Sequence, residues 1–321
     1  MNNLMDKHFY KVISLFIKAI LLFISFYYIF QKLTTADAFN SFRNIVFSVS
    51  TTLYLLLALL LMLVNWGLEA KKWQLLISSY EQLSFFQSLQ AVMAGVTLSI
   101  FTPNRIGEFT GRVFFLKKAD KFIASGKSII GSFFQLIITI LAGFVAIFVY
   151  IRYDYNSTVP LYSLFNQQKS IVWMITVLSI LILLIGIWRL SFLSKFRHDL
   201  KKMMEIKKAE WVQLFLLSLN RYLIFTLQHY LLILAMGAEV SIMEAFILIP
   251  VTFFITSIIP TFALTEIVVR SAVAVYVFAA LDSVQPASIA SASLLLWMIN
   301  LAIPALIGSI FIGKLQFFKA H

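Results

Sequence analysis

The sequence contains no cysteine, few prolines and few charged residues. Without a thiol the chain has no disulfide, no cysteine-ligated zinc or iron–sulfur cluster and no thiol nucleophile. Only 12% of its 321 residues are charged, about half the share of a soluble domain, whereas 61% are hydrophobic and the mean hydropathy is +0.91. The composition excludes a disordered, fibrous or soluble globular protein and is typical of a polytopic membrane protein.

Long apolar stretches predict helices that cross a membrane, which requires about 20 apolar residues each. Two of the apolar stretches, which begin at Phe85 and Ile242, are interrupted near Pro103 and Pro260. We expect each of these to form a broken or re-entrant helical hairpin. Uninterrupted stretches of the required length, or nearly so, cover residues 12–30, 45–65, 127–150, 171–188, 211–236 and 288–312. The predicted fold class is an all-α polytopic membrane protein with about six spanning helices and two such hairpins.

The basic residues are distributed unevenly between the predicted loops. If the N-terminus is cytoplasmic and each hairpin returns to its side of entry, 19 of the 26 Lys and Arg lie in cytoplasmic segments and 4 outside. The other three, Lys18, Arg221 and Arg270, lie within apolar stretches. This asymmetry predicts a multi-pass protein of a bacterial cytoplasmic (inner) membrane with both termini in the cytoplasm. The net charge of +12 reflects topology first. Since no soluble segment is long enough to fold into a nucleic-acid-binding domain, we expect no nucleic-acid partner.

Each interrupted stretch carries the same short pattern. A proline is followed five or six residues later by a glutamate, and the glutamate four residues later by an arginine. The two glutamates are 158 residues apart, and flanking predicted spans repeat at offsets of 159 and 161 residues. We therefore expect one membrane domain, residues 1–321, made of two inverted halves, 1–155 and 165–321, as in many secondary transporters. The alternative is that the prolines only kink two ordinary membrane helices.

The twin pattern predicts an anion-binding site near the middle of the membrane. Proline suits the first turn of a helix, where free N–H groups and the helix dipole attract anions. Glutamate and arginine four residues apart share a helix face and can pair there. The predicted substrate-binding residues are Thr102, Asn104, Glu108, Arg112, Thr261, Thr265, Glu266 and Arg270, with helix breaks at Pro103, Gly107 and Pro260.

Two roles are open for the Glu–Arg pairs. In the first, Arg112 and Arg270 bind an anionic headgroup, while Glu108 and Glu266 position them or carry a coupling proton. In the second, each pair only holds its hairpin in place. Arg221 and His229, both in the stretch 211–236, are secondary candidates.

The segment Thr-Pro-Asn-Arg-Ile-Gly-Glu at residues 102–108, followed by Arg112, resembles the flippase-like transmembrane region of lysylphosphatidylglycerol synthases, a family with a large branch that lacks the synthase domain. Residues 65–73 and 260–270 support the resemblance, which covers essentially the whole chain. The second motif departs from the family pattern, because Phe262, Ala263 and Leu264 stand where glycines are common. The resemblance implies movement of a phospholipid or related amphiphile between leaflets. Since no aminoacyl-transferase domain is recognised, we do not expect this chain to synthesise the lysyl-lipid.

Three functions remain open from the sequence. The leading hypothesis is a flippase-like protein that translocates a phospholipid or related anionic amphiphile. The alternatives are a secondary transporter of a small anion and a non-transporting subunit of a lipid-modifying enzyme. The expected partners are a membrane phospholipid with an anionic headgroup, and a lipid-modifying enzyme or a second copy of the chain. All six Asp fall in loops or at span ends, and no metal-ligand cluster appears. We therefore expect no metal, no cofactor and no catalytic residues.

Overall fold

The computed structural model describes residues 48–100, 102, 105–152, 203–259, 263–279, 281 and 283–312, and only the backbone at 150–152 and 263–265. The described part of the chain is helical and contains no strand, which confirms the all-α class. The predicted spans 12–30 and 171–188 lie outside it. Pro103, Asn104, Pro260 and Thr261 also lie outside it.

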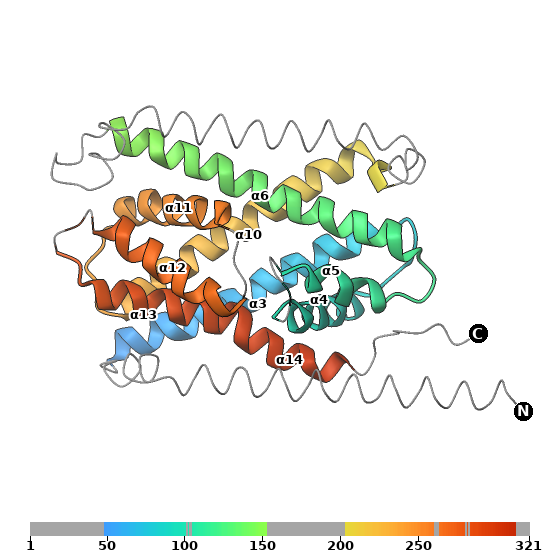
Figure 1. Cartoon of the computed structure of the whole chain (residues 1–321), viewed down its shortest axis with the longest axis horizontal. Helices are drawn as coiled ribbons and strands as arrows, with labels where there is room; N and C mark the ends of the chain where they lie inside the picture. The colour runs from blue at the N-terminus through green and yellow to red at the C-terminus, as the bar shows by residue number, and fades with distance from the viewer. Residues whose placement is uncertain are drawn as a thin grey trace, which may run out of the picture.

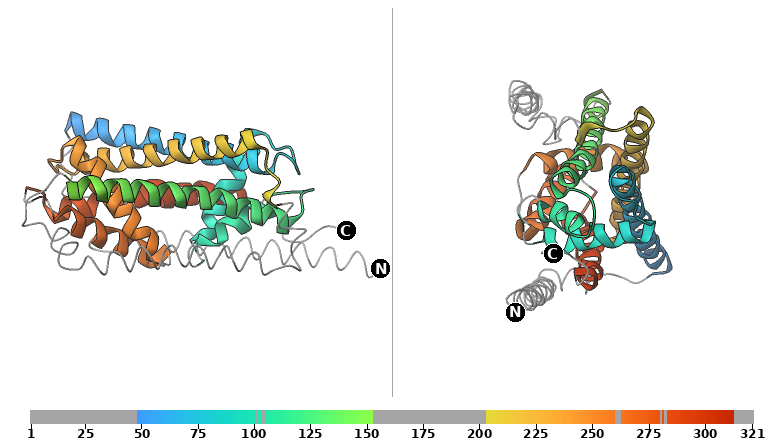
Figure 2. Two further views of the ribbon diagram at one scale, coloured as in Figure 1. Left: turned by 90° about the horizontal axis from the view of Figure 1, so that it is seen from above. Right: turned by 90° about the vertical axis from the view of Figure 1, so that its right-hand side faces the viewer.

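Long helices run along the long axis of the molecule (Figures 1 and 2). They are α3 (Val49–Ile77), α6 (Lys121–Arg152), α10 (Lys208–Ala235), and a continuous helix made of α13 (Pro286–Trp297), the π-helical turn η3 (Met298–Ala302) and α14 (Ile303–Phe311). Three described helices are long and apolar enough to cross a membrane: Val49–Ile77, Lys121–Val149 and Pro286–Phe311. Helix α10 is equally long but carries a row of polar side chains, and it packs along α3.

Both interrupted stretches are helical on each side of the break, as predicted. Helices α4 (Phe85–Ser99) and α5 (Gly107–Phe114) pack against each other, as do α11 (Ile242–Ile258) and α12 (Ala263–Phe278). The two hairpins lie at opposite ends of the long helices, and each turns back near the middle of the molecule (Figures 1 and 2). With 15, 8, 17 and 16 residues, none of the four helices reaches the about 20 residues needed to cross a membrane alone.

Glycines bring the backbones of the first hairpin into direct contact. A Cβ added to Gly95 would lie 2.5 Å from the carbonyl oxygen of Glu108, and one added to Gly111 would lie 2.6 Å from the backbone nitrogen of Gly95. Gly107, predicted to lie within the break, is the first residue of α5. Small residues at four-residue spacing allow this close approach of membrane helices.

Helix α3 extends beyond its predicted end at residue 65 as far as Ile77. The extension carries Glu69 and Lys72, which lie beyond the predicted span, yet both are buried. Their charges are tolerated inside the protein because they pair with each other and with other helices.

One carboxylate ties the loop before α4 to the loop after α5. Glu81 accepts hydrogen bonds from the backbone N–H groups of Lys117, Lys118 and Ala119, at 3.1, 2.7 and 3.0 Å. Burial alone would raise the pKa of Glu81, but these three donors lower it below its usual value. The connection closes the open end of the α4–α5 hairpin.

Candidate functional site

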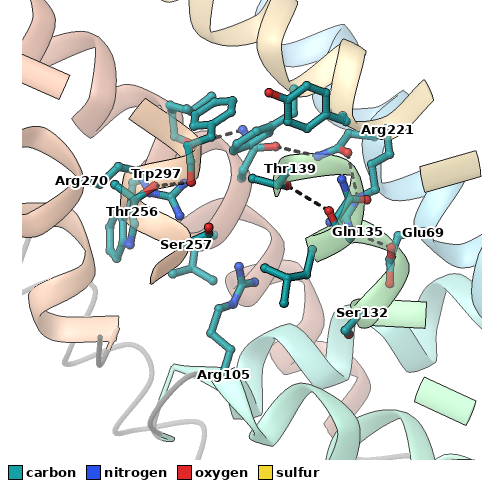
Figure 3. Close-up of a pocket in the computed structure, with 18 of the residues that line it drawn as sticks. Glu69, Arg105, Ser132, Gln135, Thr139, Arg221, Thr256, Ser257, Arg270 and Trp297 are labelled. Carbon is teal, nitrogen blue, oxygen red and sulfur yellow. Dashed lines mark hydrogen bonds and ion pairs between the residues drawn. The ribbon is translucent and has the colours of Figure 1, made fainter. Parts of the chain in front are cut away.

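A cavity of about 350 Å³ lies between the tips of the two hairpins. Helices α3, α6, α10 and α13 and the turn η3 complete its wall (Figure 3). Its polar and charged lining residues are Asn65, Glu69, Arg105, Glu108, Ser132, Gln135, Thr139, Arg221, Thr256, Ser257, Glu266, Arg270 and Asn300. The cavity therefore joins both sequence motifs, which lie 158 residues apart, to helices that the motifs did not include.

Glu69 is the centre of a buried ion network on the α3 side of the cavity. Its Oε1 lies 2.8 Å from Nη2 of Arg112, and its Oε2 lies 2.7 Å from both Nζ of Lys72 and Nη1 of Arg221. The side chains of Glu69 and Lys72 are only 2% and 1% exposed. Buried charges are stable only when paired, and this one carboxylate is the shared partner of cations from three helices.

Arg112 lies behind the cavity wall. Its side chain is fully buried, and its Nη2 is shared between Glu69 and Glu108. The predicted Glu108–Arg112 pair therefore forms, but Arg112 does not line the cavity, whereas Glu108 does. In the second hairpin, Arg270 Nη2 lies 2.6 Å from Oε1 of Glu266, and both residues line the cavity.

Arg105 forms part of the tip of the first hairpin. Its side chain extends toward the centre of the cavity (Figure 3), where its Nη2 is 3.8 Å from Oε2 of Glu108. The backbone of Arg105 has a φ of 60°, a left-handed conformation that costs a non-glycine residue about 1–2 kcal/mol. The hydroxyl of Thr102, a predicted substrate contact, accepts a hydrogen bond from the N–H of Gly107 at 2.7 Å. The tip is thus held in a strained form that presents the arginine.

A row of amide side chains crosses from α3 to α10 through the π-helical turn. Asn65 Nδ2 donates to Oδ1 of Asn300 at 3.2 Å, and Asn300 Nδ2 donates to Oε1 of Gln228 at 2.9 Å. At the α3 end of this row, Oδ1 of Asn65 accepts a hydrogen bond from Nε of Arg221 at 3.0 Å. The row therefore orients the guanidinium of Arg221 at the cavity wall.

The structure separates the two secondary candidates. Arg221 lines the cavity, and its guanidinium lies 5.3 Å from the ring of Trp66. His229 is fully buried, stacks on Phe253 and lies 3.5 Å from the hydroxyl of Ser293, outside the cavity lining. Thr265 belongs to α12, but its side chain is not described.

Several residues of the site were missed from the sequence: Asn65, Glu69, Lys72, Arg105, Gln228 and Asn300. Their common signal is a polar or charged side chain next to or inside an apolar stretch, which is costly in a membrane and often functional. Within the described residues, no cluster of His, Asp or Glu side chains is arranged to hold a metal ion.

An apolar groove of about 460 Å³ lies between α6, α10 and α11. Among its lining side chains are Leu141, Val145, Leu219 and Phe246. Tyr222 of α10 lines both this groove and the polar cavity. A polar site and an apolar surface are thus adjacent on the same helices.

Comparison with known proteins identifies one family. The profile described as lysylphosphatidylglycerol synthase TM region matches residues 12–308, nearly the whole chain. No curated protein and no solved structure matches the chain.

Proposed function

This chain belongs to the lysylphosphatidylglycerol synthase TM region family, and we propose that it translocates a phospholipid or a related anionic amphiphile between the leaflets of a bacterial cytoplasmic membrane. The observation that carries the proposal is the adjacency of two environments. A polar cavity lined by Arg105, Arg221 and Arg270 shares Tyr222 with an apolar groove between α6, α10 and α11. An amphiphile needs both environments, whereas a small hydrophilic anion needs only the first.

The arrangement of the hairpins supports the proposed transporter architecture. In that architecture two inverted halves, each with a re-entrant hairpin, meet near the midplane around the substrate. The hairpins α4–α5 and α11–α12 enter from opposite ends and their tips border one cavity. We propose six spanning helices around them and both termini on the cytoplasmic side, the orientation that the distribution of Lys and Arg favours.

Different arginines are assigned different roles in this proposal. Arg105, Arg221 and Arg270 face the cavity and would contact the headgroup, with side chains 32%, 19% and 20% exposed. Arg112, which is fully buried, would hold Glu69 and Glu108 in place behind them. Arginine suits both tasks, because its planar, permanently charged fork binds phosphate and carboxylate oxygens.

Leaflet exchange in liposomes tests the proposal. Purified protein is reconstituted with fluorescent phosphatidylglycerol, and a membrane-impermeant reductant bleaches the outer leaflet. Exchange of lipid between the leaflets lets the reductant bleach nearly all of the label, whereas about half is protected without exchange. Arg270→Gln should slow exchange at least tenfold, because it removes a cavity charge from the site. Lys71→Gln, on the exposed face of α3 beside the buried network, is the matched control and should exchange at the wild-type rate.

Two results would contradict the proposal. Exchange by Arg270→Gln at the wild-type rate would show that the cavity is not the path. Absence of exchange by folded wild-type protein across a panel of phospholipids would favour the transporter of a small anion or the subunit of a lipid-modifying enzyme. Uptake of soluble anions and co-purification of an enzyme then separate those two.

A further inference from the structure

We infer that the headgroup bound in this cavity is a phosphomonoester, a terminal phosphate with about two negative charges. The inference rests on the proposed function and concerns the chemistry of the same site. It is carried by the charge balance of the ion pairs and by the hydrogen-bond donors at the cavity wall.

The ion pairs around the cavity contain more cations than anions. Within the described residues, the basic members are Lys72, Arg105, Arg112, Arg221 and Arg270, and the acidic members are Glu69, Glu108 and Glu266. Five positive groups against three negative groups leave a surplus of two positive charges. An uncompensated charge is costly away from water, so a ligand that brings two negative charges balances the site.

The surplus is located on one side of the cavity. Arg270 pairs with Glu266 at 2.6 Å and the two cancel. On the other side, Glu69 and Glu108 face four basic groups, of which Arg105 makes the longest contact, at 3.8 Å. Arg105 is also the most exposed of these side chains, at 32%. The balance therefore places a doubly charged group between Arg105 and Arg221, both of which line the cavity.

Every carboxylate at the wall already has a basic partner. Glu69 contacts three cations, Glu108 contacts Arg112 and lies near Arg105, and Glu266 contacts Arg270. A headgroup with an ammonium group would need a carboxylate that is not already neutralised. The described wall offers none, which disfavours zwitterionic and cationic headgroups.

The hydrogen-bonding groups of the wall also select an acceptor. Among the described residues, the side-chain nitrogens Nε of Arg105, Nε of Arg270, Nε1 of Trp66 and Nε1 of Trp297 are buried donors without a hydrogen-bond partner, and all four residues line the cavity. The lining also holds one such buried acceptor, Oε1 of Gln135, and one hydroxyl that can donate or accept, that of Tyr222. A terminal phosphate presents three terminal oxygens as acceptors and about two negative charges. A phosphodiester presents two non-bridging oxygens that share one charge, so it satisfies fewer of these donors.

Binding in detergent solution tests the headgroup without requiring transport. Trp66 and Trp297 line the cavity, so tryptophan fluorescence reports occupancy. The probes, at pH 8, are dihexanoyl phosphatidate, dihexanoyl phosphatidylmethanol and glycerol 3-phosphate. The first two have the same chains but differ by one charge, and the third is a soluble phosphomonoester. Phosphatidate should bind at least about tenfold more tightly than phosphatidylmethanol.

Two variants check the origin of the preference. Arg105→Gln lowers the surplus to one charge and should reduce the preference to about threefold or less. Lys71→Gln also removes one positive charge, but on the exposed face of α3 and outside these ion pairs, so the surplus stays at two and the preference should persist.

The outcomes separate this inference from the proposed function. Equal affinity of wild-type protein for the two lipids would overturn the phosphomonoester, whether or not leaflet exchange occurs. Persistence of the wild-type preference in Arg105→Gln, or its loss in Lys71→Gln, would overturn the charge balance. Binding of glycerol 3-phosphate as tight as that of phosphatidate would keep the phosphomonoester and overturn the lipid as its source.

Discussion

Replacing Glu69 by glutamine should destabilise the protein strongly, although the two side chains have nearly the same shape. The substitution removes the charge that lies within 2.8 Å of Lys72, Arg112 and Arg221. Removing one partner of a buried ion pair costs about 3–5 kcal/mol, because the remaining charge is left without compensation. Arg112 keeps Glu108, and Arg221 keeps Asn65, so the loss falls mainly on Lys72.

These contacts place the expected loss at about 3–4 kcal/mol, the lower half of that range. For a chain of this size, each kcal/mol shifts the Tm by about 2–4 °C, so Glu69→Gln should melt about 10 °C below wild type. Tryptophan fluorescence of the purified protein in detergent measures the transition, because Trp66 and Trp73 are buried beside Glu69 in α3.

A second variant isolates the uncompensated cation. Adding Lys72→Met to Glu69→Gln removes the charge that lost its partner and replaces it by an apolar chain of similar length. The double variant should therefore melt above Glu69→Gln. Lys71→Met, one residue earlier and exposed, should not rescue it. A Tm of Glu69→Gln within about 2 °C of wild type would refute the assignment of Glu69 as the centre of the network.

Three further variants test the first hairpin. Gly95→Ala should cost about 1–3 kcal/mol, because the new Cβ would lie 2.5 Å from the Glu108 carbonyl oxygen; thermal unfolding measures this. Arg105→Gly should raise the free energy of unfolding by about 1 kcal/mol, since glycine adopts a φ of 60° freely, while lipid exchange should fall. Glu81→Gln should cost about 1 kcal/mol at pH 7, because an amide accepts the three backbone hydrogen bonds less strongly. Since the pKa of Glu81 is lowered in the folded protein, its contribution is complete above the unfolded value of about 4.3 and is lost as the pH falls through the folded pKa. The Tm should therefore change less between pH 3 and pH 7 for Glu81→Gln than for the wild-type protein.

The variants at Gly95 and Arg105 each have a matched control. Gly67→Ala adds a Cβ whose nearest neighbour is 3.7 Å away, and it should be neutral or slightly stabilising. Arg105→Gln keeps the strained backbone, so it should lose exchange without gaining stability. An increase in stability for both Arg105 variants would show that charge, not φ, is responsible.

The sequence was sufficient to predict the two hairpins and the pairing within each. Proline, glutamate and arginine at helical spacing are local features, and the pairs Glu108–Arg112 and Glu266–Arg270 form as expected. The breaks between α4 and α5 and between α11 and α12 were predicted in the same way, because interruptions of an apolar stretch are visible without knowledge of the fold.

The network around Glu69 was not predictable by the same reasoning. Hydropathy treats each charge separately, so Glu69 and Lys72 ended the predicted span at residue 65. Their partners Arg112 and Arg221 lie 43 and 152 residues further along the chain, and a local pattern cannot reveal that these charges cancel in space. Arg105 was missed for a different reason, since its orientation depends on a backbone conformation that its sequence neighbours do not encode.

The π-helical turn Met298–Ala302 holds one more residue than the α-helix would at that point. Each residue rotates the following helix by about 100°, so the extra residue sets which face the helix presents beyond the turn. Upstream and within the turn, Trp297 and Asn300 face the cavity, while downstream Gly308 packs against the backbone of Met93 in α4. Deleting one residue from the turn would disconnect these two surfaces. The extra residue is therefore a spacer that keeps the binding site and the first hairpin in phase on one continuous helix.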